Sequence, residues 1–243
     1  MNCWTLAEYA GYASPGVFQH LLSRARWDHD GVRDDLREFV TERLGTEDSV
    51  LVIDETGGRE ERHVPGGYPA SIHRHGRQDR TCSGRRLRGV GDQTGAAFVD
   101  RELCVPASWT DDPARCQAAG LPDELEFATK PALALGMVER ALAAGARPDW
   151  VAADEVYGND SHLRDALEDL GVGYVLAVSC STRVAVGPAS IRADALARAL
   201  SPECGQIRSA GAGAKGQRWY QWAYMHLQET SPAGGQRYLS AYT

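Results

Sequence analysis

Apolar residues in the first part of the chain recur at intervals of three and four, which is the spacing of one face of an α-helix. These positions are Val17, Leu21, Leu22, Val32, Leu36, Phe39, Val40 and Leu44. Ser14 and Pro15 precede the pattern and Gly45 ends it, as is typical of a helix start and stop. We therefore expect residues 1–46 to form an N-terminal helical segment that packs as a cap against the strand after it.

Two later stretches end a short apolar run with an aspartate and a turn. Residues 49–57 read SVLVIDETG, and residues 149–158 read DWVAADEVYG. This pattern is typical of a buried strand that delivers a carboxylate to a sheet edge, here Asp54 and Asp154. Two such carboxylates can hold a divalent cation between them. The alternative is that each acid only caps the turn or helix that follows it.

The rest of the pattern predicts strands that alternate with helices. Residues 96–106 alternate as in a strand, and residues 130–145 form an amphipathic helical pattern with a proline in its first turn and a glycine at its end. After the Asp154 stretch come a helical pattern at residues 162–171 and an apolar run at residues 173–179. A helical pattern, a glycine-rich turn and a strand-like RWYQWAYMHL run follow. This order predicts an α/β sheet with helices on its faces.

One basic segment interrupts this order. Residues 58–93 hold eight arginines, three histidines and many glycines, without a periodic apolar pattern. The composition is typical of an irregular loop or of a basic arm for nucleic acid.

Composition and charge exclude several classes of protein. The net charge of −7 argues against general nucleic-acid coating, although a nuclease needs an acidic site to hold metal. The six cysteines stand singly, so they suggest neither a zinc site nor a disulfide framework. We find no apolar run long enough for a membrane span and no signal-peptide pattern at the start, and we expect a cytoplasmic protein.

Several longer stretches occur in an order that resembles a known family. They include NCWTLAEYAG, RWDHDGVRDDLREFV, VLVIDETG, EFATKP, ADEVYG and SAGAGAKGQRWYQWA. With these motifs the chain resembles bacterial insertion-sequence transposases of the DDE type, in the branch called DDE superfamily endonucleases. The resemblance implies an RNase-H-like mixed sheet flanked by helices over residues 47–243, after the helical segment of residues 1–46.

The resemblance also implies a chemistry. Two Asp and one Glu would bind two Mg²⁺ (or Mn²⁺) ions for cleavage and strand transfer in DNA transposition, a DNA recombination reaction. By position, the two aspartates would be Asp54 and Asp154, and the partners would be element ends, target DNA and a second copy or full-length transposase. Glu55 and Glu155 follow these acids directly and would alternate away from the metal on a strand.

Two departures from the family pattern predict an inactive, truncated copy. The family's third acid lies in a helix beyond the RWYQWA strand, and this sequence stops at Thr243 before such a segment. With two carboxylates in place of three, metal binding and transition-state stabilisation should both suffer.

The second departure is the basic segment, where the family has two strands. Synonymous codons for residues 69–78, read one nucleotide later, can encode QRQYTGTAG, and those for residues 84–89 can encode VAVYVA. We therefore expect residues 58–95 to be an aberrant, irregular segment produced by a frameshift. The strand of Asp54 would then lose a hydrogen-bonding neighbour.

Two other functions stay open. The chain could be a non-catalytic DNA-binding or regulatory transposase fragment that uses the N-terminal helices, the basic segment, Lys215 and Arg218. Glycine-rich surroundings would let backbone amides beside Lys215 and Arg218 approach phosphate, although a turn followed by a strand also explains them. A metal-dependent hydrolase on another α/β fold is the remaining possibility.

Overall fold

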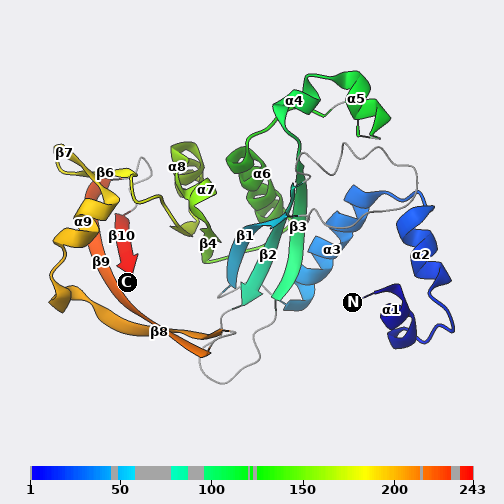
Figure 1. Cartoon of the computed structure of the whole chain (residues 1–243), viewed down its shortest axis with the longest axis horizontal. Helices are drawn as coiled ribbons and strands as arrows, with labels where there is room; N and C mark the ends of the chain where they lie inside the picture. Colours follow the sequence, from blue (N-terminus) through cyan, green and yellow to red (C-terminus); the bar gives the residue numbers. More distant parts are fainter. Residues whose placement is uncertain are drawn as a thin grey trace.

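The computed structural model describes residues 2–44, 49–57, 78–86, 96–119, 121–122, 125–213, 216–230 and 236–242. Within these residues, three helices lead into a five-stranded mixed sheet with its covering helices, and a three-stranded antiparallel sheet lies at the other end of the molecule (Figure 1). The first helices are α1 (Cys3–Tyr9), α2 (Gly16–Ser23) and α3 (His29–Leu44).

The five-stranded sheet has the strand order β3-β2-β1-β4-β5. Its strands are β1 (Ser49–Gly57), β2 (Gln78–Arg86), β3 (Ala96–Cys104), β4 (Trp150–Ala153) and β5 (Gly173–Leu176). β1, β2 and β3 pair antiparallel, whereas β4 is parallel to both β1 and β5. This mixed α/β sheet is compatible with the RNase-H-like fold, so the predicted fold class is confirmed.

The expectation that residues 58–95 are irregular is wrong for β2. Gln78–Arg86 pairs with β1 along its whole length, from Ser49 opposite Arg86 to Gly57 opposite Gln78, and it also pairs with β3. Strand preference depends strongly on context, and β1 and β3 offer the backbone of this polar segment a ladder on both sides. β1 therefore keeps the neighbour that it was expected to lose. The other residues of 58–95, up to the start of β3, lie outside the described residues, and the frameshift itself stays a prediction.

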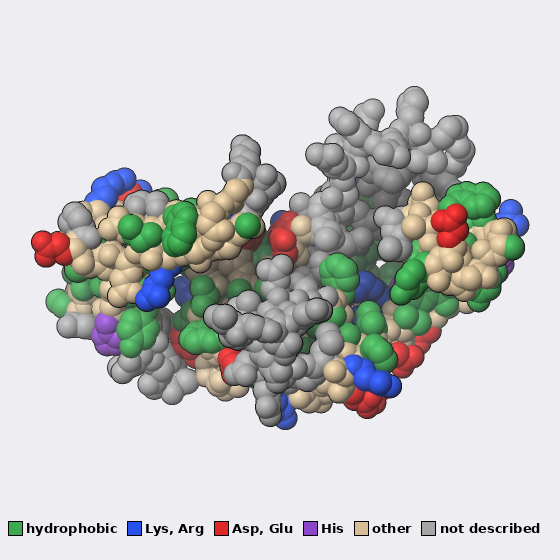
Figure 2. All heavy atoms as spheres, turned by 90° about the horizontal axis from the view of Figure 1, so that it is seen from below, with side chains coloured by type: hydrophobic (Ala, Val, Ile, Leu, Met, Phe, Trp, Pro, Cys, Tyr) green, Lys and Arg blue, Asp and Glu red, His purple; other side chains and the backbone are tan. Residues whose placement is uncertain are grey.

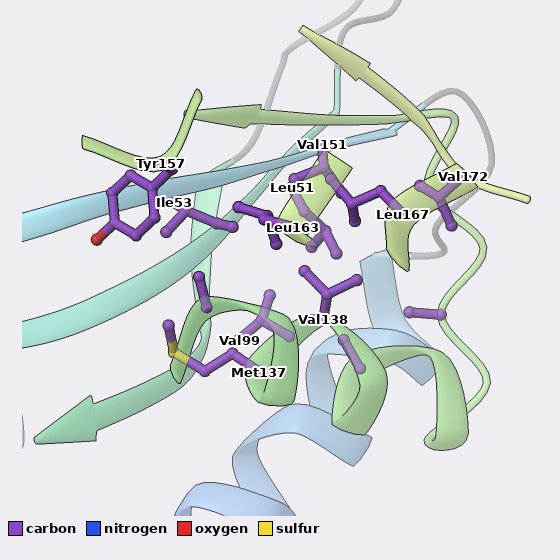
Figure 3. Packing of buried hydrophobic residues seen from close by; sticks show 13 residues of the cluster. Leu51, Ile53, Val99, Met137, Val138, Val151, Tyr157, Leu163, Leu167 and Val172 are labelled. Carbon is purple, nitrogen blue, oxygen red and sulfur yellow. The ribbon is translucent and has the colours of Figure 1, made fainter. Parts of the chain in front are cut away.

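The core lies between the sheet and helices on one of its faces (Figure 3). Its main contributors are α6 (Lys130–Ala143) and α8 (Ser161–Asp169). Thr129 and Asp160 cap these helices by accepting hydrogen bonds from Ala132 N (3.3 Å) and Leu163 N (2.9 Å). The buried apolar side chains of this core include Leu51, Ile53, Val99, Met137, Val138, Val151, Tyr157, Leu163 and Leu167.

Shorter elements complete the described chain. They are α4 (Ala107–Thr110), α5 (Pro113–Ala118), α7 (Glu155–Gly158), β6 (Arg183–Val186), β7 (Ala189–Arg192), α9 (Ala193–Ala199) and η1 (Pro202–Cys204). The C-terminal sheet has the order β10-β9-β8, from β8 (Gln206–Gly213), β9 (Gly216–Thr230) and β10 (Gln236–Tyr242). A small second core forms around α4 and α5 from Val105, Trp109 and Cys116.

The N-terminal helices form as the spacing predicts, but much of their apolar face is exposed. Val17, Val32 and Phe39 are each at least half exposed, and Figure 2 shows hydrophobic side chains on the surface at both ends of the molecule. α3 lies against β3 and contributes Val40 to the main core, so the cap forms on β3 rather than on the strand directly after the helices.

A buried ion cluster fastens α3 to the sheet. The Asp100 carboxylate on β3 is fully buried and lies 3.0 Å from Arg37, 3.5 Å from Arg33 and 2.9 Å from Arg140 of α6. On the rim of the cluster, the hydrogen bond from Arg33 lowers the pKa of the Asp34 carboxyl. One buried carboxylate thus links two helices to one strand, and the three guanidinium groups compensate its buried charge.

We expect Asp100→Asn to lower the free energy of unfolding by about 3–5 kcal/mol, because three guanidinium groups would lose their buried counter-charge. Asp35→Asn on the exposed side of α3 is the matched control and should change it by less than about 0.5 kcal/mol. Urea denaturation measures both, and equal effects of the two variants would contradict the proposed role of the cluster.

Candidate active site

The two predicted acids lie where the parallel pairing of β1 with β4 ends. The expectation that the first strand itself ends at Asp54 is wrong, because β1 continues to Gly57 in its pairing with β2. β1 and β4 pair so that Ile53 stands opposite Ala153, and Asp54 and Asp154 are the next residue on each strand line. Two residues that are 100 positions apart in the chain therefore lie at adjacent interior strands of the sheet. The structure brings the predicted pair together.

Alternation along the strands places both acids on the same face of the sheet. Leu51 and Ile53 are buried in the core, so Asp54 points to the opposite face. Val151 is buried and Ala153 packs against the same core, so Asp154, in extended conformation, also points away from it. Both aspartates are exposed. The acid pair, Asp54 and Asp154, thus lies on the face that the helices of the core do not cover.

Backbone amides hold one oxygen of each carboxylate. Asp54 Oδ1 accepts a hydrogen bond from Glu55 N at 2.7 Å, and Asp154 Oδ1 accepts one from Val156 N at 2.9 Å. Asp154 is therefore also the N-cap of α7, as the capping alternative predicts. Among the described contacts, the second oxygen of each side chain makes no hydrogen bond. Capping and cation binding are compatible roles for Asp154.

Glu55 and Glu155 do not join the acid pair. Glu55 points to the opposite face, where both of its oxygens lie within 2.9 Å of Lys130 Nζ at the start of α6. Glu155 occupies the exposed first turn of α7. The role of Lys130 could not be predicted from the EFATKP motif that contains it, because only the fold brings Lys130 and Glu55 together.

The turn that carries Asp154 is fastened to the chain after β5. Asn159 Oδ1 accepts hydrogen bonds from Ser179 N (3.0 Å) and Thr182 Oγ1 (2.7 Å), while Ala177 N donates to Ala153 O (3.0 Å). Gly158 lies so close to this segment that an added Cβ would overlap the carbonyl oxygen of Ala177. No sequence signal marked Asn159, because its partners are about twenty residues away.

Of the two predicted DNA-contacting residues, Arg218 lies in a different sheet from the acid pair. Arg218 belongs to β9 of the C-terminal sheet, where it donates to Ala210 O of β8 at 2.9 Å. Lys215 lies outside the described residues. Arg218 is therefore not part of the acid pair.

The donor set of the acid pair fits a hard divalent cation. Mg²⁺ prefers oxygen ligands and is commonly held by one or two carboxylates together with waters and substrate phosphates. Two exposed carboxylates, each with one oxygen outside the described hydrogen bonds, meet this need. In the part of the chain that the structure describes, no third His, Cys, Asp or Glu joins them in a metal-binding group.

Comparison with known families agrees with this geometry. A mixed sheet that presents two exposed carboxylates where the pairing of two parallel strands ends is a candidate cation-binding α/β domain. The chain belongs to the DDE superfamily endonucleases, whose family model matches residues 5–215 and so includes both acids. A search of curated proteins found no match. Among the described helices, none is long and apolar enough to cross a membrane.

We expect Gly158→Ala to destabilise the fold by more than about 2 kcal/mol, because its Cβ would force α7 away from Ala177. Gly136→Ala, inside α6, is the control: its Cβ would meet only Arg140 at 3.7 Å, and it should stabilise by about 0.5–1 kcal/mol. Thermal and urea unfolding give both values. A neutral Gly158→Ala would show that the close approach does not constrain the Asp154 turn.

Proposed function

We propose that this chain is a transposase-type DNA endonuclease domain in which Asp54 and Asp154 hold Mg²⁺ or Mn²⁺ for strand cleavage and transfer in DNA transposition. The observation that carries the proposal is the placement of two exposed carboxylates on one face, directly after the last residues that pair β1 with β4, in a member of this family. Element ends and target DNA would be the substrates, and a second copy or a full-length transposase would be the protein partner.

The bound ions would activate a water or a 3′-hydroxyl and stabilise the leaving oxygen of the phosphodiester. The protein itself would orient the two carboxylates. The amides of Glu55 and Val156 orient Asp54 and Asp154, which leaves the second oxygen of each for the cation. Lys130 ties the end of β1 to α6 through Glu55, and this bond holds the strand end that carries Asp54.

Charge explains why a cation is needed here. Two exposed carboxylates repel the phosphates of DNA, and the whole chain carries a net charge of −7. A divalent ion held by both would neutralise their two negative charges, and a phosphate could then approach. DNA engagement at the acid pair should therefore depend on the metal.

We further propose that cleavage by these residues alone is slow. The two carboxylates are enough for a cation shared with substrate phosphates, but the family chemistry uses a third acid. If the metal is held less rigidly, stabilisation of the transition state should fall more than binding of the substrate. The cleavage rate should therefore fall more than the DNA affinity. Binding and cleavage should thus be measured separately.

Isothermal titration with Mn²⁺ tests the metal site. We expect Asp54→Asn and Asp154→Asn each to weaken Mn²⁺ binding by at least about tenfold, because each removes a charged ligand. Asparagine keeps the N-cap of α7, so the fold should survive at Asp154. Asp169→Asn, an exposed acid at the end of α8, should leave binding unchanged. Equal binding in all four proteins would place the Mn²⁺ elsewhere.

Nicking of supercoiled plasmid tests the chemistry. We expect slow, Mn²⁺-dependent nicking that Asp54→Asn and Asp154→Asn abolish and that Asp169→Asn retains. Nicking that survives in both acid-pair variants would contradict the assignment. DNA binding without any nicking, even at high enzyme concentration, would favour the non-catalytic DNA-binding role instead.

A further inference from the structure

The C-terminal sheet presents two faces of different character. On β9, Ala223, Met225 and Leu227 alternate with the aromatic residues between them. Leu227 is 5% exposed, and Ala223 and Met225 are partly buried, so this side faces inward along the second half of β9, whereas Trp219 on the same side is 61% exposed. The residues between them therefore lie on the outward face.

The outward side is a row of rings, which we call the aromatic face: Tyr220, Trp222, Tyr224 and His226 of β9, and Tyr238 of β10. His226 stands opposite Tyr238, and their ring centroids are 5.1 Å apart. The rings of Tyr220 and Trp222 are 6.3 Å apart. These contacts confirm that both strands place their rings on the same side.

The aromatic face reaches solvent at its centre. Tyr224 is 65% exposed and Tyr238 is 57% exposed, whereas large aromatic side chains on a sheet are normally used for burial. Hydrophobic side chains and a histidine are visible on the surface at the end of the molecule that holds this sheet (Figure 2). A row of exposed rings of this kind is a surface of the type that binds a partner.

Charge indicates the chemistry of that partner. The strands β8, β9 and β10 contain three arginines and one glutamate, in a chain whose net charge is −7. Arg208 of β8 stands directly opposite Tyr220. Arg218 is two residues before Tyr220 on β9 and therefore lies on the same face, so both arginines belong to the aromatic face. Aromatic rings flanked by guanidinium groups complement a polyanion that carries planar aromatic groups.

We propose that the aromatic face binds unpaired DNA bases by stacking, with Arg208 and Arg218 close to the phosphates. Base faces are accessible to side chains only where a strand is unpaired, and aromatic rings beside basic groups bind such strands with little sequence preference. The proposal rests on the proposed function only in taking DNA as the substrate. It uses none of the residues that hold the metal.

The aromatic face would therefore hold a displaced or frayed strand while the acid pair acts on the backbone. Stacking needs no divalent ion, whereas engagement at the acid pair needs one. Binding measured in EDTA consequently excludes the acid pair, and failure of the nuclease proposal would leave binding by the aromatic face intact.

Fluorescence anisotropy with a labelled oligothymidine of about twenty nucleotides, in EDTA and at low salt, tests the proposal. We expect Tyr224→Ala and Tyr238→Ala each to weaken binding by about fivefold or more, and Tyr224→Phe to retain it because the ring remains. The matched control is Trp219→Ala, which removes an equally exposed ring (61%) from the same strand but from the opposite face. It should leave binding unchanged.

Three results would overturn the proposal. One is equal loss of binding in Trp219→Ala and Tyr224→Ala. Another is tighter binding of the matching duplex than of the single strand. The third is absence of oligothymidine binding together with a dimer in solution that Tyr224→Ala dissociates, which would assign the face to a second copy of the chain. Circular dichroism of each variant shows whether the sheet has kept its structure.

Discussion

The parallel pairing of β1 with β4 is the constraint on which the rest of this structure depends. Parallel neighbours require a long crossover, and here the intervening chain supplies β2, β3 and α6 before β4 begins. The crossover helix covers the face on which Leu51, Ile53 and Val151 are buried. Because side chains alternate along a strand, burial of these residues on one face places Asp54 and Asp154 on the opposite face. The register between β1 and β4 thus determines both the position of the hydrophobic core and that of the acid pair.

Elements whose own residues contain the signal could be predicted from the sequence. The apolar runs of β1 and β4 and the Pro-to-Gly pattern of α6 each indicate their structure locally. The same runs place Asp54 and Asp154 directly after the buried residues, although β1 continues past Asp54 to Gly57. The pairing of the two acids could be expected only as a possibility, since it needs the strand order.

Features that depend on partners distant in sequence could not be predicted. The sequence of β2 has no alternating strand pattern. It forms a strand because its backbone pairs with β1 on one side and β3 on the other. The apolar spacing of α2 and α3 predicted helices correctly but suggested a buried face, while Val17 and Phe39 are exposed. Likewise, Lys130 and Asn159 support the site through contacts with partners in other elements.

The pairing of β2 has a consequence for how this sheet can change over generations. A strand whose place is set by the backbone of two flanking strands carries little information in its own side chains, in contrast to β1, where one inserted residue would turn the buried set and the acid to the wrong faces. We therefore expect β2 to tolerate substitutions better than β1. The segment beside the acid pair can lose its resemblance to relatives while the architecture around it persists.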